Sequence, residues 1–441
     1  MAGATYTFGG SFNMDAGPKT GLALLWGADP LYLMGGMRKE SFRAAILAGA
    51  KLVVINPKKI DTAKRADLWL GPRPQSDGIL ALGIIKVMIE ERLYDVDFVS
   101  KWTVGFEGLQ EHVKTFSLDD VEKLTWVPKA KIVEAAKIIG THKPMCLLVG
   151  NALERGIHAF QAVRAVYILE ALAGEMNVPG GNSYGVPAPF MRMGKFFLLK
   201  GSPRKLEKGL CSPFKVGMQA AYVPPQSLVR ALLEEKPYPI KAALCILSNP
   251  LVSYPDTEAT YQAFLKLDFF VASELFPTPT TAVADIVLPA AWQAEHDTVG
   301  YWPGWFGDIR AYPKIVDPPG EAKTDAWWLT ELAKRLGFGD VFWKDEREVL
   351  DFWLQPTGLT WEAFKKKRII RATYDYRKPG SFKTPSGKAE IYSEQLKKLG
   401  YDPMPIWQNL SQFRYEPSEE YPFLMTNRKE EGYMLTGYKH V

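Results

Sequence analysis

Two short motifs place a polar side chain where an apolar segment ends, and these residues have types that could do chemistry. Asp29 stands before a proline after the apolar run 22–26, and Asn249 stands before a proline after the run 243–247. Carboxylate and amide groups can hydrogen-bond the ribose and base of a nucleotide. Taken alone, each motif is better explained as a turn, because Asp and Asn bond their own backbone and proline stops a strand.

Residues that bind metals or transfer protons are sparse. Cys146, Cys211 and Cys245 form no Cys-x-x-Cys pair and have no histidine close by, so they predict core packing rather than a zinc or iron–sulfur site. The five histidines are scattered singly, and we therefore assign no catalytic residue. The sequence contains no GxGxxG turn after its first apolar run, no Walker A motif and no HExxH helix. A conventional nucleotide-dependent dehydrogenase is therefore disfavoured.

The elements that must position the polar residues alternate between strands and helices. Apolar runs predict strands and helical spacing of apolar residues predicts helices, in the order strand 21–25, helix 39–47, strand 51–55, helix 77–90, helix 128–139, strand 145–149 and helix 160–173. Short apolar strands separated by helices are typical of a parallel sheet covered on both faces. The fold class is therefore α/β. Residues 179–189 are rich in Gly, Pro, Ser and Asn and predict a long loop, either functional or a linker.

An internal repeat is the most informative feature of the sequence. Three segments recur in the same order: 22–30 with 243–250, 51–56 with 269–273, and 62–70 with 281–288. In this match, Asn56 and Ser273 both follow the second strand of their unit. Two related α/β units are therefore predicted. Because ligands of open parallel sheets lie beyond the carboxyl ends of the strands, the repeat favours two nucleotide-like ligands, or one held between the units.

Composition excludes several other classes. The chain has 441 residues, of which 47% are hydrophobic and 23% are charged, which excludes disordered and fibrous proteins. A net charge of +5 over this length is too small to indicate a nucleic-acid or membrane surface. No run approaches the roughly 20 apolar residues that span a bilayer, and the first residues lack the pattern of a secretion signal. We expect a soluble protein, cytoplasmic in preference to periplasmic.

Seven segments in order along the chain resemble one family. They are LLWGADP (24–30), LVVINPKK (52–59), ADLWLGPRPQSD (66–77), LLVGNALERG (147–156), LSNP (247–250), ADIVLPAA (284–291) and FKTPSGKAEIYS (382–393). Together they resemble the molybdopterin oxidoreductases, molybdenum or tungsten enzymes of the dimethyl-sulfoxide-reductase and formate-dehydrogenase type. The resemblance implies two molybdopterin guanine dinucleotides, whose dithiolenes hold the metal, bound across a pair of related α/β domains. It also implies electron transfer to an iron–sulfur cluster, which is expected outside this chain.

The resemblance also implies which residues bind the cofactor in the first half of the chain. The first strand-end loop would contribute Trp26, Gly27, Ala28 and Asp29, and the second strand end Asn56, Pro57 and Lys58. Gln75, Ser76 and Asp77 match the family's P-x-[ST]-D pattern near a guanosine, and Val149, Gly150 and Leu153 match a loop that reaches the pterin.

The second half of the chain would supply corresponding positions. Asn249, Ser273 and Glu274 would hold a nucleotide, Asp325 would pair with a guanine, and Thr426, Asn427 and Arg428 match the start of the family's C-terminal β-barrel. Carboxylates and amides suit base and ribose edges, while cations and backbone N–H groups suit pyrophosphate. For Glu274 and Asp325, capping of a following helix is the alternative interpretation.

The departures from the family pattern concern the metal. The family's N-terminal iron–sulfur domain is missing, as is the Cys, selenocysteine or Ser that coordinates the metal, which in the family lies just before a segment like 2–10. We expect no protein-derived metal ligand within these residues. The chain would then be a fragment or one subunit of a split enzyme, whose remaining N- and C-terminal portions are partners. One specific hypothesis is an upstream selenocysteine codon that was read as a stop.

These observations define the expected organisation and function. The predicted parts are a first α/β dinucleotide-binding domain (1–190), a linking segment (191–225), a second, related α/β domain (226–340), a connector (341–415) and the truncated start of the dinucleotide-binding β-barrel (416–441). The expected function is the cofactor core of an oxidoreductase that acts on a small substrate such as formate, a sulfur compound or an oxo-anion. A non-redox hydratase of the same family and a metal-free scaffold subunit of a respiratory complex are the alternatives.

Overall fold

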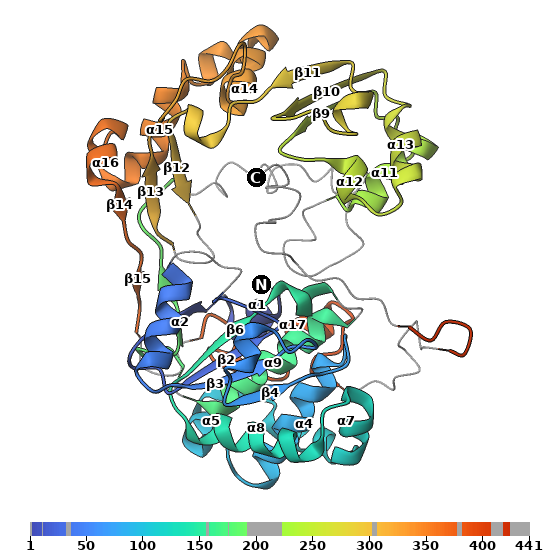
Figure 1. Cartoon of the computed structure of the whole chain (residues 1–441), viewed down its shortest axis with the longest axis vertical. Helices are drawn as coiled ribbons and strands as arrows, with labels where there is room; N and C mark the ends of the chain where they lie inside the picture. The colour runs from blue at the N-terminus through green and yellow to red at the C-terminus, as the bar shows by residue number, and fades with distance from the viewer. Residues whose placement is uncertain are drawn as a thin grey trace. The chain divides into compact units, whose positions relative to one another are not determined.

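The computed structural model describes most of the chain and divides it into two compact units. The described residues are 2–10, 12–31, 37–155, 158–174, 176–191, 223–301, 307–376, 382–406 and 418–423. Unit 1 contains the described residues up to Gly185 and from Tyr374 onward, and unit 2 contains those from Val186 to Thr373. Each unit is coloured by residue number in Figure 1. Among the described residues, no helix is long and apolar enough to cross a membrane.

Unit 1 is built on a four-stranded parallel sheet. Its strands are β2 (Leu22–Trp26), β3 (Lys51–Ile55), β4 (Leu68–Leu70) and β6 (Met145–Val149), in the order β4-β3-β2-β6. All five residues of β2 are buried, as the uninterrupted apolar run predicts for a central parallel strand. The predicted strands 51–55 and 145–149 have the same bounds as β3 and β6, and the predicted strand 21–25 is displaced by one residue from β2.

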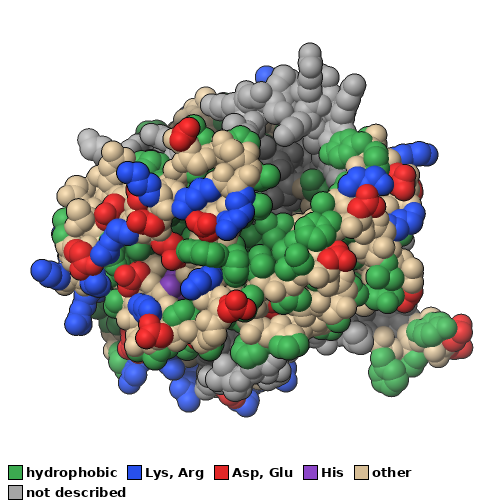
Figure 2. Space-filling model, turned by 90° about the horizontal axis from the view of Figure 1, so that it is seen from above, with side chains coloured by type: hydrophobic (Ala, Val, Ile, Leu, Met, Phe, Trp, Pro, Cys, Tyr) green, Lys and Arg blue, Asp and Glu red, His purple; other side chains and the backbone are tan. Residues whose placement is uncertain are grey.

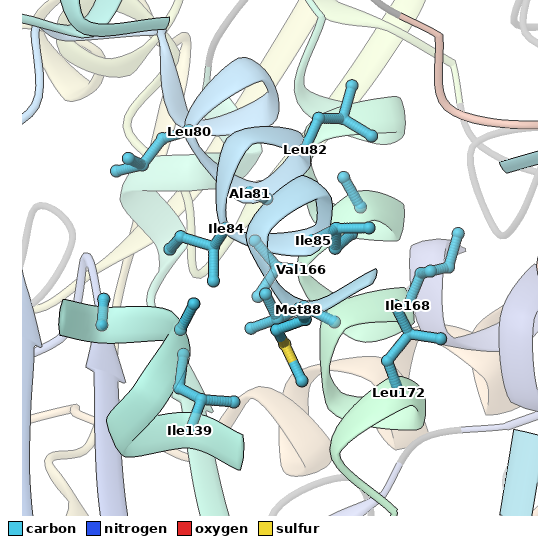
Figure 3. Close-up of a cluster of buried hydrophobic side chains, with 14 of the residues drawn as sticks. Leu80, Ala81, Leu82, Ile84, Ile85, Met88, Ile139, Val166, Ile168 and Leu172 are labelled. Atoms are coloured by element: carbon cyan, nitrogen blue, oxygen red, sulfur yellow. The ribbon is translucent and has the colours of Figure 1, made fainter. Parts of the chain in front are cut away.

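Helices cover both faces of this sheet. Their bounds are α1 (Ala2–Phe8), α2 (Met37–Leu47), α3 (Asp61–Lys64), α4 (Asp77–Glu90), α5 (Val96–Trp102), α6 (Phe106–Val113), α7 (Leu118–Thr125), α8 (Lys129–Thr141), η1 (Asn151–Arg155), α9 (Ala159–Ala173) and α17 (Glu394–Lys398). Helices α4, α8 and α9 form the larger core, in which Ile84, Ile139 and Val166 meet (Figure 3). On the opposite face of the sheet, Phe42 of α2 and Cys146 of β6 belong to a second hydrophobic core. Cys146 therefore fills the core, as expected.

Four short strands complete unit 1. They are β1 (Asn13–Met14), β5 (Thr103–Val104), β7 (Asn182–Ser183) and β16 (Ala389–Glu390), with β1 paired to β7 and β5 to β16. The side chain of Asn182 binds the edge strand β6, because its Oδ1 accepts from the Leu147 N–H at 2.8 Å and its Nδ2 donates to the Leu147 carbonyl at 2.9 Å. Part of the expected 179–189 loop is therefore fixed to the sheet.

Unit 2 contains a smaller parallel sheet and an antiparallel one. The parallel strands are β9 (Ala242–Ile246), β10 (Phe269–Glu274) and β11 (Ile286–Pro289), in the order β11-β10-β9, and α11 (Pro225–Glu234) and α13 (Thr257–Phe264) cover one face. The antiparallel strands are β12 (Thr298–Tyr301), β13 (Ile309–Tyr312) and β14 (Ile369–Ile370), packed with α15 (Glu346–Leu354) and α16 (Trp361–Lys367). The other elements are β8 (Gly185–Val186), α12 (Pro250–Ser253), η5 (Thr281–Val283), η6 (Gln293–Glu295), α14 (Asp325–Ala333), η7 (Lys334–Phe338), η8 (Gly339–Val341), η9 (Gln355–Thr357) and β15 (Thr373–Tyr374).

The internal repeat is present in the structure, with one correction to its register. Sheet order β4-β3-β2 in unit 1 matches β11-β10-β9 in unit 2. The Asp67 carboxylate accepts from the Leu52 N–H at 2.8 Å, and the Asp285 carboxylate accepts from the Phe270 N–H at 2.6 Å. These two bonds align Leu52 with Phe270, so Ser273 corresponds to the last residue of β3. The sequence match of Ser273 with the residue after β3 was therefore wrong by one position, because apolar runs alone do not fix where a strand begins.

Candidate functional site

The carboxyl ends of the unit 1 strands bring three predicted segments side by side. Trp26 is in register with Ile55 on one side and with Val149 on the other. Beyond the strand ends the pairing continues, since the Gly27 N–H donates to the Ile55 carbonyl and the Gly150 N–H donates to the Trp26 carbonyl, both at 2.8 Å. The first strand-end loop, the second strand end and the predicted pterin loop therefore share one edge of the sheet.

Two glycines allow the loops at this edge to approach closely. Gly27 has a φ of +62°, a left-handed conformation that favours glycine. A Cβ added to Gly150 would lie 1.9 Å from the Gly27 carbonyl oxygen, and one added to Gly27 would lie 2.5 Å from Leu153 Cδ1. Leu153 is itself buried in the larger core. The two loops therefore pack so closely that there is no space for a side chain at Gly27 or Gly150. Backbone groups form the surface of the sheet edge at this point.

Asp29 is engaged inside the protein. It is buried, as is Ala28, and its Oδ1 accepts a hydrogen bond from the Thr62 hydroxyl at 2.6 Å. Thr62 is fully buried in α3, which leads into β4. This bond ties the first strand-end loop to the segment before the third strand. The structure thus gives Asp29 a role in holding the loop, which the sequence reasoning did not foresee because Thr62 is far along the chain.

The second strand end presents a cation. Asn56 Oδ1 accepts from the Lys58 N–H at 3.0 Å and forms a tight turn, which leaves Pro57 and Lys58 exposed. The next residue, Lys59, places its ammonium 5.4 Å from the ring centre of Trp69. A rigid turn that carries exposed ammonium groups suits an anionic group such as a phosphate.

The segment before α4 places a carboxylate at the start of a helix. Asp77 is the first residue of α4, and its Oδ1 accepts from Trp26 Nε1 at 2.8 Å. Burial raises the pKa of Asp77, and the hydrogen bond from Trp26 acts in the opposite direction. Ser76 is buried and donates to the Arg73 carbonyl at 2.7 Å, while Gln75 is exposed with a φ of +72°. Of this trio, Asp77 has the acceptor group best suited to a base edge.

The unit 2 edge repeats this arrangement with other residues. Asn249 Oδ1 accepts from the buried Thr280 hydroxyl at 2.6 Å, as Asp29 does from Thr62. Asp325 is the first residue of α14, and its Oδ1 accepts from the Ser273 hydroxyl at 2.6 Å. Asp77 and Asp325 are therefore similarly placed, each at a helix start and each bonded to a strand end, although Asp77 is bonded to the first strand of its sheet (β2) and Asp325 to the second (β10).

Neither Asp325 nor Glu274 caps a helix. The cap of α14 is Thr324, whose hydroxyl accepts from the Trp327 N–H at 3.0 Å, so Asp325 is not the capping residue. Glu274 ends β10 and bonds the N–H of the next residue, Leu275, at 2.8 Å, rather than the start of a helix. Both side chains thus lie at the carboxyl edge of the sheet without a capping role.

Some of the predicted residues belong to parts of the chain that the structure does not describe. Thr426, Asn427, Arg428 and Cys211 lie outside the described residues. Within the described part of the chain, no group of three or more His, Cys, Asp or Glu side chains could hold a metal ion. Sequence reasoning missed the similar placement of Asp77 and Asp325, although each follows a hydroxyl residue, Ser76 or Thr324. In unit 2, residues 290–323 lie between β11 and the pair Thr324–Asp325, so the sequence alone does not show this similarity.

Comparisons with known proteins identify a family and several relatives of this chain. The family model described as molybdopterin oxidoreductase matches residues 2–335. The chain is 34% identical over 423 residues to the acetylene hydratase of Syntrophotalea acetylenica, covering 88% of this chain and 57% of the relative. It is 28% identical over 400 residues to the F420-dependent formate dehydrogenase subunit alpha of Methanocaldococcus jannaschii, covering 86% and 56%. The solved acetylene hydratase from Pelobacter acetylenicus superposes with a TM-score of 0.80 at 31% identity, covering 92% of this chain and 60% of that structure. The chain thus spans somewhat more than half the length of these relatives.

Proposed function

Because this chain belongs to the molybdopterin oxidoreductase family, we propose that it is the cofactor-binding core of a molybdenum or tungsten enzyme with two molybdopterin guanine dinucleotides, one on each unit. Membership of the family implies a molybdopterin cofactor with one of these metals. The proposal that the cofactor is a guanine dinucleotide, and that two of them bind, depends on the similar strand-end sites of units 1 and 2. The observation that carries the proposal is that each unit has a carboxylate, Asp77 or Asp325, at a helix start and hydrogen-bonded to a strand end of its parallel sheet.

The two carboxylates fit the guanine end of such a ligand. Guanine presents two adjacent N–H donors on one edge, and a carboxylate can accept both. Trp26 and Ser273 each donate to a single oxygen, Oδ1, and so orient the carboxylate at the sheet edge. Asp77 and Asp325 would therefore bind the two bases, one in each unit.

The remaining predicted residues would hold the rest of the ligand. Lys58 is exposed at the second strand end and would neutralise a phosphate, and the turn formed by Asn56 keeps it there. Backbone groups of Gly27 and Gly150 would face the ligand, because their packing leaves no space for side chains. When bound, the metal held by the pterin dithiolenes supplies the electron-transfer or Lewis-acid chemistry. A metal-free scaffold is disfavoured, because it would have no use for two oriented carboxylates.

The reaction itself is proposed in two forms. The first is two-electron redox chemistry on formate, a sulfur compound or an oxo-anion, with electrons passing to an iron–sulfur cluster in a partner subunit or domain. The relative named as a formate dehydrogenase subunit supports it. The second is a non-redox hydratase, supported by the likeness, in sequence and in structure, to proteins named acetylene hydratase. In both forms the protein ligand to the metal comes from outside these residues.

One set of measurements tests the proposal. Protein made in a host that synthesises the cofactor is assayed for pterin, for molybdenum or tungsten, and for formate oxidation with a dye acceptor against acetylene hydration. We expect pterin and metal in the purified protein, together with one of the two activities when its partners are present. Protein from a competent host that contains neither pterin nor metal would overturn the proposal.

A further inference from the structure

Unit 2 contains a cavity of about 300 Å³ that lies along one face of α15. It is lined by Trp343, Glu348, Asp351, Phe352 and Gln355. The last four lie at helical spacing along α15 and the residue after it, and Trp343 precedes this helix. A volume of this size is at the lower end of the range for small-molecule sites. None of these residues is assigned to the cofactor, so the cavity is a different site from the strand ends.

Two aromatic rings form the apolar part of the cavity wall. The ring centres of Trp343 and Phe352 are 5.5 Å apart, and their planes are inclined by 59°. Both side chains are half-buried, and both line the cavity. The face of an aromatic ring carries a negative partial charge and attracts a cation that comes within about 6 Å of the ring centre. This wall therefore suits a positively charged ligand that also has an apolar part.

Two carboxylates lie beside the rings, and each is fixed through one of its oxygens. Glu348 Oε2 accepts from the Lys344 N–H at 2.7 Å, and Asp351 Oδ1 accepts from the Trp361 N–H at 2.6 Å. Trp361 is the first residue of α16, so the second bond also ties α15 to α16. Within the described part of the chain, the other oxygen of each carboxylate accepts no hydrogen bond. One oriented oxygen of each group is therefore available to a ligand.

No basic side chain lines the cavity among the described residues. Arg347 of α15 pairs with Glu362 of α16. Lys334 Nζ pairs with Glu331 at 2.8 Å, and the exposed side chain of Lys344 is not part of the lining. Elsewhere acidic and basic side chains lie side by side, as on much of the face drawn in Figure 2. The two carboxylates of the cavity therefore remain uncompensated.

We propose that this cavity binds a small organic cation, an alkylammonium or alkylguanidinium compound. Trp343 and Phe352 would contact its apolar chain and the near side of its charged group, while Glu348 and Asp351 would accept hydrogen bonds from that group. The carboxylates would repel an anion, and a neutral apolar molecule would cost them their solvation without a polar partner.

A metal ion fits the cavity less well than an organic cation. Only two carboxylates line it, and in the described part of the chain no group of three or more His, Cys, Asp or Glu side chains could hold a metal. Calcium and magnesium take six or more oxygen ligands, and they would leave the rings unused. The site goes beyond the proposed function, because none of its residues binds pterin, guanine or metal in that proposal.

The test is a ligand-detected NMR titration of the full chain with butylammonium, butylguanidinium and their neutral analogue butanol. At least one of the two cations is expected to bind about tenfold more tightly than butanol. Glu348→Gln and Asp351→Asn keep an oxygen that accepts the backbone bond but remove the charge, so each should weaken cation binding about fivefold. Trp343→Leu keeps an apolar wall without the charge distribution of the ring, and should weaken it about threefold.

Controls separate the cavity from a general attraction of cations to acidic surface groups. The Asp317 side chain is 91% exposed in unit 2 and lies outside the cavity, so Asp317→Asn should leave all three affinities unchanged. Butanol affinity and melting temperature should be the same in Glu348→Gln as in the wild type, because the cavity keeps its shape. If Asp351→Asn loosens the start of α16 and melts earlier, Glu348→Gln still decides the result.

The outcomes that overturn the inference are distinct from failure of the proposed function. Cation affinities that are equal in wild type and Glu348→Gln would refute the site, and so would a wild type that binds neither cation more tightly than butanol. A short lysine or arginine peptide that binds far more tightly than both free cations would overturn the small-molecule assignment and give the cavity to a partner's side chain. Absence of pterin and metal from protein made in a competent host would refute the proposed function alone.

Discussion

Units 1 and 2 carry the same hydrogen-bond framework on sheets that are buried to different extents. Leu24 in β2 is fully buried, whereas Leu244, its counterpart in β9, is 41% exposed. In unit 1, β6 pairs with β2, and helices α4, α8 and α9 cover one face of the sheet. In unit 2, β9 is an edge strand among the described residues. The framework therefore does not depend on a complete core. It consists of a few directed bonds that position the strand ends, and the residues at those ends are free to differ.

The largest expected difference between the units is their response to pH. Glu170 of α9 is fully buried in unit 1, neither carboxyl oxygen has a partner among the described residues, and burial raises its pKa from 4.5 to about 8. Its folded pKa exceeds the unfolded value, so the folded unit binds the extra proton. Stability should thus fall as pH rises from about 4.5 to about 8, by about 1.4 kcal/mol per pH unit. Denaturant melts across this range check the slope.

The matched variant for this prediction is Glu170→Gln. It keeps the size of the side chain and cannot ionise, so the slope that Glu170 contributes should disappear while the stability at low pH is little changed. In the described part of unit 2, side-chain hydrogen bonds from lysine or arginine lower the pKa values of Asp317, Glu331 and Glu362. A pH slope as steep in Glu170→Gln as in the wild type would contradict the assignment.

A smaller difference should appear between two leucines at equivalent places. Leu24→Ala removes a fully buried side chain and should lower the free energy of unfolding by about 3 kcal/mol. Leu244→Ala removes a side chain that is 41% exposed and should cost about 1 kcal/mol. Chemical denaturation of the two variants measures both values. Equal costs would show that the exposed face of β9 is covered in the protein.

The smallest expected effect concerns the charge of the loop anchor. Asp29→Asn keeps an oxygen that can accept from Thr62 but removes the charge, so it converts the unit 1 bond into the kind found in unit 2. Bonds to charged groups are stronger, and the variant should lose about 1 kcal/mol of stability. The reciprocal Asn249→Asp should change stability by less than about 0.5 kcal/mol, because Asn249 is only half-buried. A larger effect in unit 2 than in unit 1, read from thermal melts, would reverse this ranking.

The sequence predicted those parts of the fold that local patterns determine. Continuous apolar runs predicted β3 and β6, because strands of a parallel sheet are buried on both faces. Helical spacing of apolar residues predicted α4. Turn residues after the runs located the strand ends, and with them the candidate site. These features depend on neighbours in the sequence.

The features that escaped prediction depend on distant residues. The bond from Thr62 to Asp29 and the shift of Ser273 by one position follow from how strands pair, which apolar runs do not encode. The packing of residues 382–406 in unit 1 also depends on a distant residue. Buried Arg164 of α9 donates hydrogen bonds to the carbonyls of Glu390 and Ile391, both at 3.1 Å. No local pattern links a buried arginine to carbonyl groups more than two hundred residues away.

The central claim is that each unit binds one guanine through a similarly placed carboxylate. The most direct test is the guanosine monophosphate released by acid from purified protein, counted per chain for wild type, Asp77→Asn and Asp325→Asn, each made in a host that synthesises the cofactor. An amide offers only one acceptor oxygen and no charge, so each variant should lose one of two equivalents. Two equivalents in the wild type and one in each variant are predicted. Equal content in all three proteins, or none in the wild type, would contradict the account.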